Sequence, residues 1–273
     1  MDLTISIVNY NTKNLVKQCV KNIINSNISL DYEIIITDNN SSDNSCELFN
    51  KEIIPHFSRV RLIKSKSNRG FGAGHNLSLQ KSNAMPAGGQ AKYTLIINSD
   101  IIILNDAIGQ LYNFMERQPL CGIAGPKLLY PDLTIQPSCH PWPKFITPLY
   151  RRTLLSRTAW GLKETKRYDM LDYDHKEAKK VDWLVGACLM VRKTVWDKIQ
   201  GFDERYFLYC EDIDICHKCW GAGFEVWYIP EAKMIHYHKR LSAQKKWWKA
   251  CFDKSSRIHL QSHWKYFRKW GIK

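Results

Sequence analysis

The first half of the chain alternates between short apolar runs and segments with helical periodicity. The apolar runs cover residues 4–10, 32–37, 60–63 and 93–98. Continuous apolar strands of this kind are typical of parallel sheets that are buried on both faces. Helices are expected between them, for instance near residues 74–82 and 106–117. This alternation predicts an α/β fold, Rossmann-like, with a mostly parallel central sheet and flanking helices.

Polar clusters follow these strands at residues 9–11, 38–43, 68–76 and 98–100. In open α/β sheets, ligands bind beyond the carboxyl ends of the strands. The clusters are therefore predicted to line one binding site.

The second half departs from this rhythm. Residues 137–180 carry four prolines, many charges and little periodicity, which indicates a loop-rich insertion or lid. A buried strand is expected over residues 181–192, then a short helix that ends at Gly201 and a strand near residues 226–229.

Composition excludes several classes of protein. Hydrophobic residues make up 44% and charged residues 24% of the 273 positions, which are ordinary globular values. No apolar run reaches the ~18 residues of a membrane span, and the first residues do not resemble a secretory leader. Nine scattered cysteines favour a reducing compartment over a disulfide framework. A cytoplasmic protein is expected.

The net charge of +14 is concentrated in residues 239–273, which hold eleven Lys/Arg and one acidic residue. The same segment contains the aromatic residues Trp247, Trp248, Phe252, Trp264, Tyr266, Phe267 and Trp270. Such a tail suits an anionic membrane surface or a nucleic acid. The alternative is a solvated helix that packs a few aromatic side chains on the main domain.

The motif DNNSSDNS (residues 38–45) follows a strand and precedes a helix. Ser42 or Asp43 could simply cap that helix. A calcium loop is excluded because its sixth position is Asp43 rather than glycine and its twelfth is Phe49 rather than glutamate. Asp38, at the strand end, could accept a hydrogen bond from the ring N–H of a nucleobase.

The motif NRGFGAGHN (residues 68–76) is rich in glycine, which lets backbone approach a ligand closely. It is a poor dinucleotide fingerprint because the third glycine of G-x-G-x-x-G is missing. A contact between backbone amides and a nucleoside diphosphate fits better, with Arg69 as a partner of the phosphate or ribose.

Two acidic motifs are candidates for metal binding and for general-base catalysis. Asp100, in the sequence NSD, follows a strand and could hold Mg²⁺ or Mn²⁺ with a diphosphate, or could merely cap a helix. Glu211 and Asp212 adjoin an aromatic run in GFDERYFLYCEDID (residues 201–214) and could act as a general base or as helix-dipole partners. Zinc is disfavoured because only one CxxC pair, Cys216 and Cys219, is present.

In their order along the chain, SIVNYN, DNNSSDNS, NRGFGAGHN, NSD, GACLMVR, GFDERYFLYCEDID and PEAKMIH resemble the inverting family 2 glycosyltransferases of GT-A fold. The resemblance is strongest to rhamnosyltransferase-type enzymes of bacterial surface polysaccharide synthesis. It runs from Leu3 to His238, apart from the insertion, and the ending HWKYFRKWG also looks like that subgroup.

The resemblance implies a role for each motif. Asp212 would be the catalytic base, with Glu211 as the fallback. Asp100 would bind a divalent cation, Mg²⁺ or Mn²⁺, with His236 near the metal or diphosphate. The first acid of the family's D-x-D element is Asn98 here, so of that element Asp100 alone would hold the metal. The donor would contact Asn9, Asp38, Asn68, Arg69, Gly70, Asn76 and Asp100.

The resemblance further implies a donor such as dTDP-rhamnose and an acceptor carried on a polyprenyl diphosphate, as in O-antigen synthesis. UDP-hexose and UDP-N-acetylhexosamine donors fit the motifs equally. The expected division is a domain over residues 1–238, with a donor half (1–136), the insertion and a catalytic half (181–238), followed by the 239–273 tail. The tail would hold the enzyme peripherally on the cytoplasmic face of the inner membrane.

Two alternatives come from other classes. A nucleic-acid-binding protein would use the basic tail but leave the acidic motifs without a role, so no nucleic-acid partner is expected. A nucleotidyltransferase would need a triphosphate loop rich in glycine and basic residues near its N-terminus, and SIVNYNTKN is not one.

Overall fold

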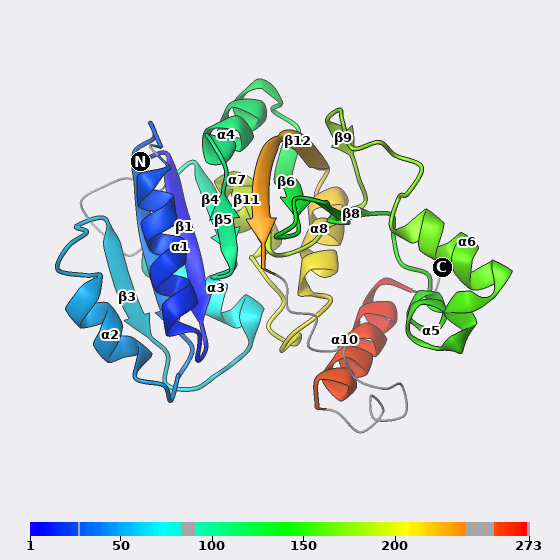
Figure 1. Ribbon diagram of the computed structural model, residues 1–273, viewed down its shortest axis with the longest axis horizontal. Coiled ribbons are helices and arrows are strands. Elements are labelled where there is room, and N and C mark those ends of the chain that lie inside the picture. Colours follow the sequence, from blue (N-terminus) through cyan, green and yellow to red (C-terminus); the bar gives the residue numbers. More distant parts are fainter. Residues whose placement is uncertain (27, 83–90, 238–253, 272–273) are drawn as a thin grey trace.

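A ten-stranded sheet runs through the middle of the molecule (Figure 1). The computed structural model describes residues 1–26, 28–82, 91–237 and 254–271. Two further strands, β8 (Cys139–His140) and β10 (Trp183–Leu184), pair in a separate small sheet. The strands of the large sheet are β1 (Leu3–Asn9), β2 (Tyr32–Asp38), β3 (Val60–Lys64), β4 (Tyr93–Ile97), β5 (Ile101–Ile103), β6 (Cys121–Leu129), β7 (Ile135–Gln136), β9 (Lys179–Lys180), β11 (Cys188–Arg192) and β12 (Glu225–His236).

The sheet is mostly parallel, as the sequence predicts. Its order is β3-β2-β1-β4-β11-β6-β12-β5, with β7 and β9 paired to β6 and β12. The strands β3, β2, β1 and β4 pair in parallel, and so do β6 and β12, whereas β11 and β5 run antiparallel to their neighbours. The carboxyl ends of β1, β2 and β4 consequently lie at one edge, where their polar residues meet.

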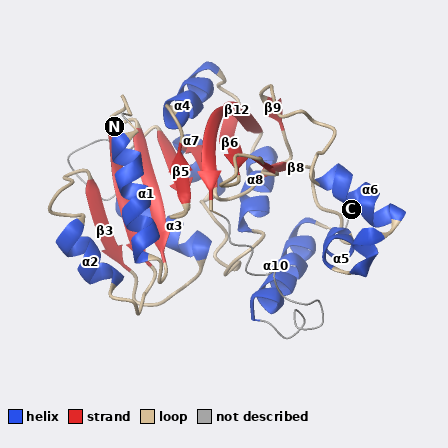
Figure 2. Cartoon of the chain, in the orientation of Figure 1, coloured by secondary structure: helices blue, strands red, loops and turns tan. Residues whose placement is uncertain are grey.

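Helices cover both faces of the sheet (Figure 2). They are α1 (Lys13–Asn25), α2 (Ser45–Glu52), α3 (Phe71–Ser82), α4 (Ala107–Arg117), α5 (Thr147–Arg152), α6 (Ala159–Tyr168), α7 (Lys193–Ile199), α8 (Glu211–Gly221) and α10 (Lys254–Trp270), with the 3-10 turn η1 (Leu154–Arg157). In the described ranges, none is both long and apolar enough to cross a bilayer.

Two hydrophobic cores explain this layering. One contains the apolar stripes of α1, α2 and α4, and the other contains those of α3, α7, α8 and α10. Residues of β4 alternate between them, since Leu95 and Ile97 face the first core and Ile96 the second. Burial on both faces is what selects the continuous apolar runs seen in the sequence.

The second half differs from the sequence expectation in three places. The single strand expected over 181–192 is split into β10 and β11, because the chain turns around Gly186. The strand expected at 226–229 extends to His236 through a register shift between Ile229 and Lys233. Residues 137–180 are more regular than predicted, because Thr153 and Thr158 cap η1 and α6 through their side chains.

The helix α10 is built into the main domain. Tyr266 and Phe267 are buried in the second core. Lys269 lies between the carboxylates of Asp203 and Asp214, at 2.9 and 2.8 Å from their oxygens. For this part of the tail the packing alternative holds, whereas Trp247, Trp248 and Phe252 lie outside the described residues, as does the proposed boundary at residue 238.

Candidate active site

The loops after β1 and β2 are joined by a hydrogen-bonded bracket around Asp38. Asn9 donates from Nδ2 to Asp38 Oδ1 at 2.6 Å and to Ser41 Oγ at 2.9 Å. Asp38 Oδ2 accepts from the backbone N–H of Ser41 at 3.0 Å, while Asn9 Oδ1 accepts from the Thr12 hydroxyl. Asn9 and Asp38 are both buried, so the bracket fixes the shape of this edge before any ligand arrives.

A second bracket, centred on Asn39, joins this edge to the loop before α3. Asn39 Nδ2 donates to Asn68 Oδ1 at 2.9 Å and to the Gly70 carbonyl at 3.0 Å. Asn68 Oδ1 also accepts from the Gly70 N–H. Sequence reasoning gave Asn39 no role, although it adjoins Asp38, because its partners are distant in sequence.

Gly70 joins the strand ends around Asp38 to the acidic segment 201–214. It adopts a φ of +99°, and a Cβ built there would lie 2.2 Å from the carbonyl oxygen of Phe207. The same carbonyl accepts from the Phe71 N–H at 3.0 Å. Only glycine combines this backbone conformation with so close an approach, so Gly70 sets the distance between the two halves.

Arg69 and Asn76 lie on the outer side of this junction. Arg69 forms an ion pair with Glu204, and Asn76 holds the backbone of Phe202 through both atoms of its amide. The structure thus brings Asn9, Asp38, Asn68 and Gly70 together but places Arg69 and Asn76 against the segment 202–204. Their assignment to the donor site stays a prediction.

Asp100 and His236 meet at the neighbouring strand ends. His236 Nε2 lies 3.4 Å from Asp100 Oδ1, and His236 Nδ1 lies 3.1 Å from Gln136 Oε1. Two ligands of one octahedral Mg²⁺ or Mn²⁺ are separated by about 3 Å, so a carboxylate and an imidazole at this distance fit a divalent ion. The described residues contain no group of three or more His, Cys, Asp or Glu side chains placed to bind metal. Further ligands would have to come from a diphosphate and water.

Glu211 and Asp212 begin α8, after two strained residues. Tyr209 and Cys210 have φ values of +69° and +64°, a conformation that costs non-glycine residues energy and often marks functional sites. This turn directs both carboxyls to the helix start. Asp212 Oδ2 accepts from the Gly186 N–H at 3.1 Å, and Oδ1 accepts from the Ile213 N–H at 2.9 Å. The Gly186 turn that splits the predicted strand therefore positions Asp212.

The two carboxyls titrate differently from free acids. Burial, and then the charge of Asp212, raises the pKa of Glu211 well above its ordinary value. Burial also raises the pKa of Asp212, against the opposing effect of its backbone hydrogen bonds. Glu211 is 5% exposed, and among the described residues its Oε2 has no hydrogen-bond partner. A protonated Glu211 beside an ionised Asp212 is the arrangement that these environments favour.

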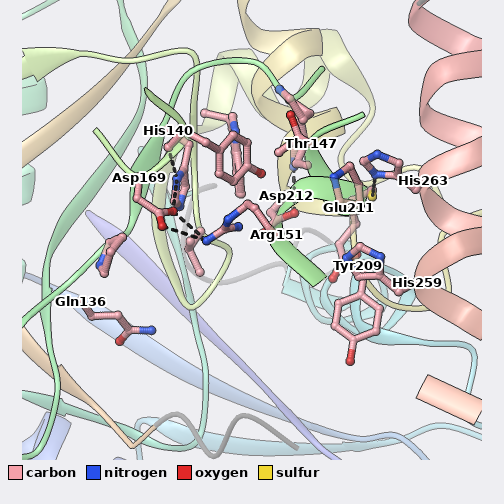
Figure 3. A pocket seen from close by; sticks show the side chains of 18 residues that line it. Gln136, His140, Thr147, Arg151, Asp169, Tyr209, Glu211, Asp212, His259 and His263 are labelled. Atoms are coloured by element: carbon pink, nitrogen blue, oxygen red, sulfur yellow. Dashed lines mark hydrogen bonds and ion pairs between the residues drawn. The ribbon is translucent and has the colours of Figure 1, made fainter. Parts of the chain in front are cut away.

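Both carboxyls line a cleft of about 280 Å³ (Figure 3). The insertion supplies Thr147, Arg151 and Asp169 to its wall, and α10 supplies His259 and His263. Gln136 also lines it, which connects the cleft to the Asp100–His236 corner. The sequence indicated that the insertion is a loop or lid and that HWKYFRKWG is a feature of the subgroup, but it assigned no residue of either segment to the site, because both reach the cleft only through tertiary packing.

The chain resembles known proteins over almost its whole length. A family model described as "Glycosyltransferase like family 2" matches residues 2–255. An N-acetylglucosaminyl-diphospho-decaprenol L-rhamnosyltransferase of Mycobacterium tuberculosis (strain CDC 1551 / Oshkosh) is 29% identical over 212 residues, covering 75% of this chain and 66% of the relative. The rhamnosyltransferase WbbL of Escherichia coli (strain K12) is 28% identical over 269 residues, covering 96% and 91%.

Solved structures agree on the architecture. A crystal structure of GalNAc-T7 with UDP, GalNAc and Mn²⁺ superposes with a TM-score of 0.63 at 13% identity, covering 86% of this chain and 44% of that chain. At this identity the likeness concerns the fold, and the GT-A fold expected from the sequence is confirmed.

Proposed function

Because the chain belongs to glycosyltransferase-like family 2, we propose that it is an inverting glycosyltransferase that uses a nucleoside-diphosphate sugar. The first proposed donor is dTDP-rhamnose, because the two relatives described above are named rhamnosyltransferases. A UDP-hexose or UDP-N-acetylhexosamine is the alternative donor. The proposed acceptor is a hydroxyl of a saccharide carried on a polyprenyl diphosphate, as in O-antigen or other surface polysaccharide synthesis.

The observation that carries this proposal is the buried pair of carboxyls at the start of α8. Asp212 is held by two backbone N–H groups and opens into a cleft large enough for a sugar ring. Its raised pKa makes it a stronger proton acceptor than an exposed aspartate. No covalent intermediate is required of such a site.

In the proposed reaction, Asp212 accepts the proton of the acceptor hydroxyl while that oxygen attacks the anomeric carbon. The bond from that carbon to the diphosphate oxygen breaks on the opposite face, so the configuration inverts. Glu211, kept protonated by burial, donates a hydrogen bond to a neighbouring oxygen of the acceptor and does not compete for the proton.

The donor is proposed to lie across the other strand ends. Asp38 would accept from the base, while the Asn9 and Asn39 brackets keep the loops in shape. Asp100 and His236 would hold Mg²⁺ or Mn²⁺ at the diphosphate. The ion would stabilise the negative charge that develops on the departing diphosphate.

The proposed setting is the cytoplasmic face of the inner membrane, where a lipid-linked acceptor would be met. The expectation that residues 239–273 hold the chain there stays a prediction, since residues 238–253 lie outside the described part.

A thermal-shift panel tests the donor site. We expect one of the thymidine, uridine and guanosine diphosphates to raise the melting temperature in the presence of Mn²⁺. At ~100 times its dissociation constant a ligand stabilises a fold by about 2.7 kcal/mol. Asp100→Ala should abolish the metal-dependent part of the shift.

The matched control is Asp132→Ala, which removes an exposed turn carboxylate and should leave the shift unchanged. If no diphosphate shifts the wild-type chain at millimolar concentration, the proposed function is wrong.

A further inference from the structure

The helical insertion between β8 and β9 exposes an unusual number of large apolar side chains. Trp160 is 76% exposed, Leu154 61% and Leu162 59%. The same segment also exposes Phe145, Ile146, Leu149, Leu155 and Leu171. They belong to α5, η1, α6 and their flanking residues, three elements that pack against one another at the edge of the molecule (Figure 1). Apolar groups gathered in this way mark contact surfaces on soluble proteins.

The interior of the insertion contains two buried acids beside the buried ring of Tyr168. Glu164 is 6% exposed and accepts hydrogen bonds from the Thr147 hydroxyl and, at 2.7 Å, from Arg167. Asp169 is similarly buried and pairs with Arg151 at 2.7 Å. A helical unit that folds only for water places these groups the other way round, with leucine and tryptophan inside. The reversed arrangement indicates that the outer surface faces an apolar phase.

The charge of the segment identifies that phase. Residues 144–171 hold seven Lys/Arg and two acidic residues, Glu164 and Asp169, and both acids are paired inside the unit. Arg157 and Lys163 lie among the exposed apolar positions on η1 and α6. A second copy of this chain would bring the same positive charge and be repelled. An anionic lipid surface matches both properties, because it attracts cations and accepts apolar side chains at its boundary.

We propose that residues 144–171 are the surface on which this chain lies against an anionic membrane. Thr147, Pro148 and Arg151 of the same segment line the cleft that holds Glu211 and Asp212. A lipid-linked acceptor could then reach the carboxyls while its tail stays in the bilayer, a consequence that rests on the proposed function. The membrane contact itself does not depend on it.

Sedimentation with vesicles tests the contact. The full chain is mixed with vesicles of phosphatidylglycerol and phosphatidylethanolamine, or of phosphatidylcholine alone. Leu154→Glu/Leu162→Glu should lower the partition onto the anionic vesicles about tenfold or more. The matched control Leu15→Glu/Leu120→Glu makes the same change of charge at two other exposed leucines, which are 39% and 57% exposed. It should bind within about twofold of the wild type, since like charges far from the contact are largely screened.

Each outcome decides. Equal loss in both variants would reveal a general charge effect, and equal retention would move the contact to residues 239–273; either result overturns the proposal. Failure of the wild-type chain to bind anionic vesicles does the same. Light scattering on the chain without vesicles tests for self-association. If the wild type is a dimer and Leu154→Glu/Leu162→Glu is a monomer, this surface is an interface between copies and the proposal is wrong.

The diphosphate thermal shift is measured on the same samples. If it persists while vesicle binding is absent, only the membrane contact is wrong. If vesicle binding follows the expected pattern and the thermal shift is absent, only the proposed function is wrong.

Discussion

The loops that follow β1 and β2, around Asp38, differ from the start of α8, at Glu211, in how their buried polar groups are hydrogen-bonded. Asp38 accepts hydrogen bonds from Asn9 and from the Ser41 backbone, and Asn39 is bonded on both sides of its amide. Glu211 is buried to a similar degree, yet its Oε2 accepts no hydrogen bond within the part of the chain that the structure describes. The hydrogen-bonding groups of Asp38 and Asn39 are thus satisfied, whereas the carboxyl of Glu211 includes an unsatisfied oxygen, which destabilises the fold.

This difference matches the two proposed roles, which are donor binding around Asp38 and proton transfer at Glu211 and Asp212. A satisfied bracket gives a rigid surface that a nucleotide can bind without reordering it. Burial makes the ionised form of both carboxyls unfavourable and raises both pKa values; in the proposed reaction this keeps Glu211 protonated and makes Asp212 a stronger proton acceptor. Substitutions in the first region should therefore weaken both folding and donor binding, while substitutions in the second should reduce turnover and leave the fold as stable or more so.

Asp212→Asn should have the largest effect. The variant keeps the size of the side chain but cannot accept a proton, so kcat should fall about 10³-fold. The melting temperature should change little, because removal of a buried charge offsets the one backbone hydrogen bond, from Gly186 or Ile213, that an amide cannot accept. Steady-state assays with lipid-linked acceptor, beside thermal melts, check both parts. A variant that keeps more than about a tenth of wild-type kcat would pass the role of base to Glu211.

Gly70→Ala should come next, because it disturbs the junction of the two regions. A Cβ would strain the φ of +99° and collide with the Phe207 carbonyl, destabilising the fold by about 3 kcal/mol. Donor KM should rise as the Asn68–Gly70 loop moves. Gly223→Ala is the control, since its φ is +86° but nothing lies within 4 Å of its added Cβ. Equal chemical-denaturation midpoints for the two variants would show that the junction is not tight.

Asp38→Asn tests the bracket itself. An amide can accept from only one of the two donors that Asp38 now holds, so one of Asn9 Nδ2 and Ser41 N loses its partner. Leaving such a buried group unsatisfied costs about 2 kcal/mol, and donor affinity should fall about tenfold with it. Asp43→Asn, in the same loop, should cost less because Asp43 is only half-buried, whereas Asp38 is buried. Calorimetric titration with the diphosphate separates the two; a larger loss in Asp43→Asn would contradict the bracket.

Glu211→Gln should have the smallest effect, and its sign is the informative part. Because burial raises the pKa of Glu211 in the folded state, stability is full below the unfolded pKa and is lost as the pH rises toward the folded pKa. The variant should avoid that loss. Its free energy of unfolding relative to wild type should increase by up to about 1.4 kcal/mol for each pKa unit that separates the two states, seen in denaturation curves from pH 5 to pH 8.

Asp203→Asn should change the stability at neutral pH in the opposite direction. Hydrogen bonds from Arg205, and also from Lys269, hold the pKa of Asp203 below its ordinary value. The stability from Asp203 is therefore present above the unfolded pKa and lost as the pH falls toward the folded pKa. Both variants should approach the wild type at low pH. Above the unfolded pKa they should differ from it with opposite signs, Asp203→Asn being less stable and Glu211→Gln more stable; differences of the same sign would contradict the electrostatic contrast.

The sheet could be predicted from sequence because burial on both faces selects long apolar runs, as in β2 and β4. The ends of those strands could be predicted as well, since polar residues follow at once. The split at Gly186 could not, because the sequence there stays apolar and the turn is fixed by a hydrogen bond to Asp212, 26 residues away.

The site was predictable only where a motif is local. Asp212 and Asp100 stand beside strand or helix ends that the pattern reveals, and His236 entered through the family resemblance. Asn39 and Gln136 were not identified, since their significance lies in contacts with Asn68 and His236 that arise from the fold. The inward polar groups of the insertion were hidden for the same reason: its sequence has no period that shows which residues face inward.

The ion pair between Lys269 and Asp214 has a consequence for synthesis on the ribosome. Asp214 lies in the helix that carries the acidic pair, and Lys269 follows 55 residues later. The sheet and the strand ends around Asp38 can form on a nascent chain while α10 is still untranslated. The helix α8 then lacks the cationic partner of its fully buried Asp214, so a partly made chain can assemble the proposed donor site before the proposed catalytic site.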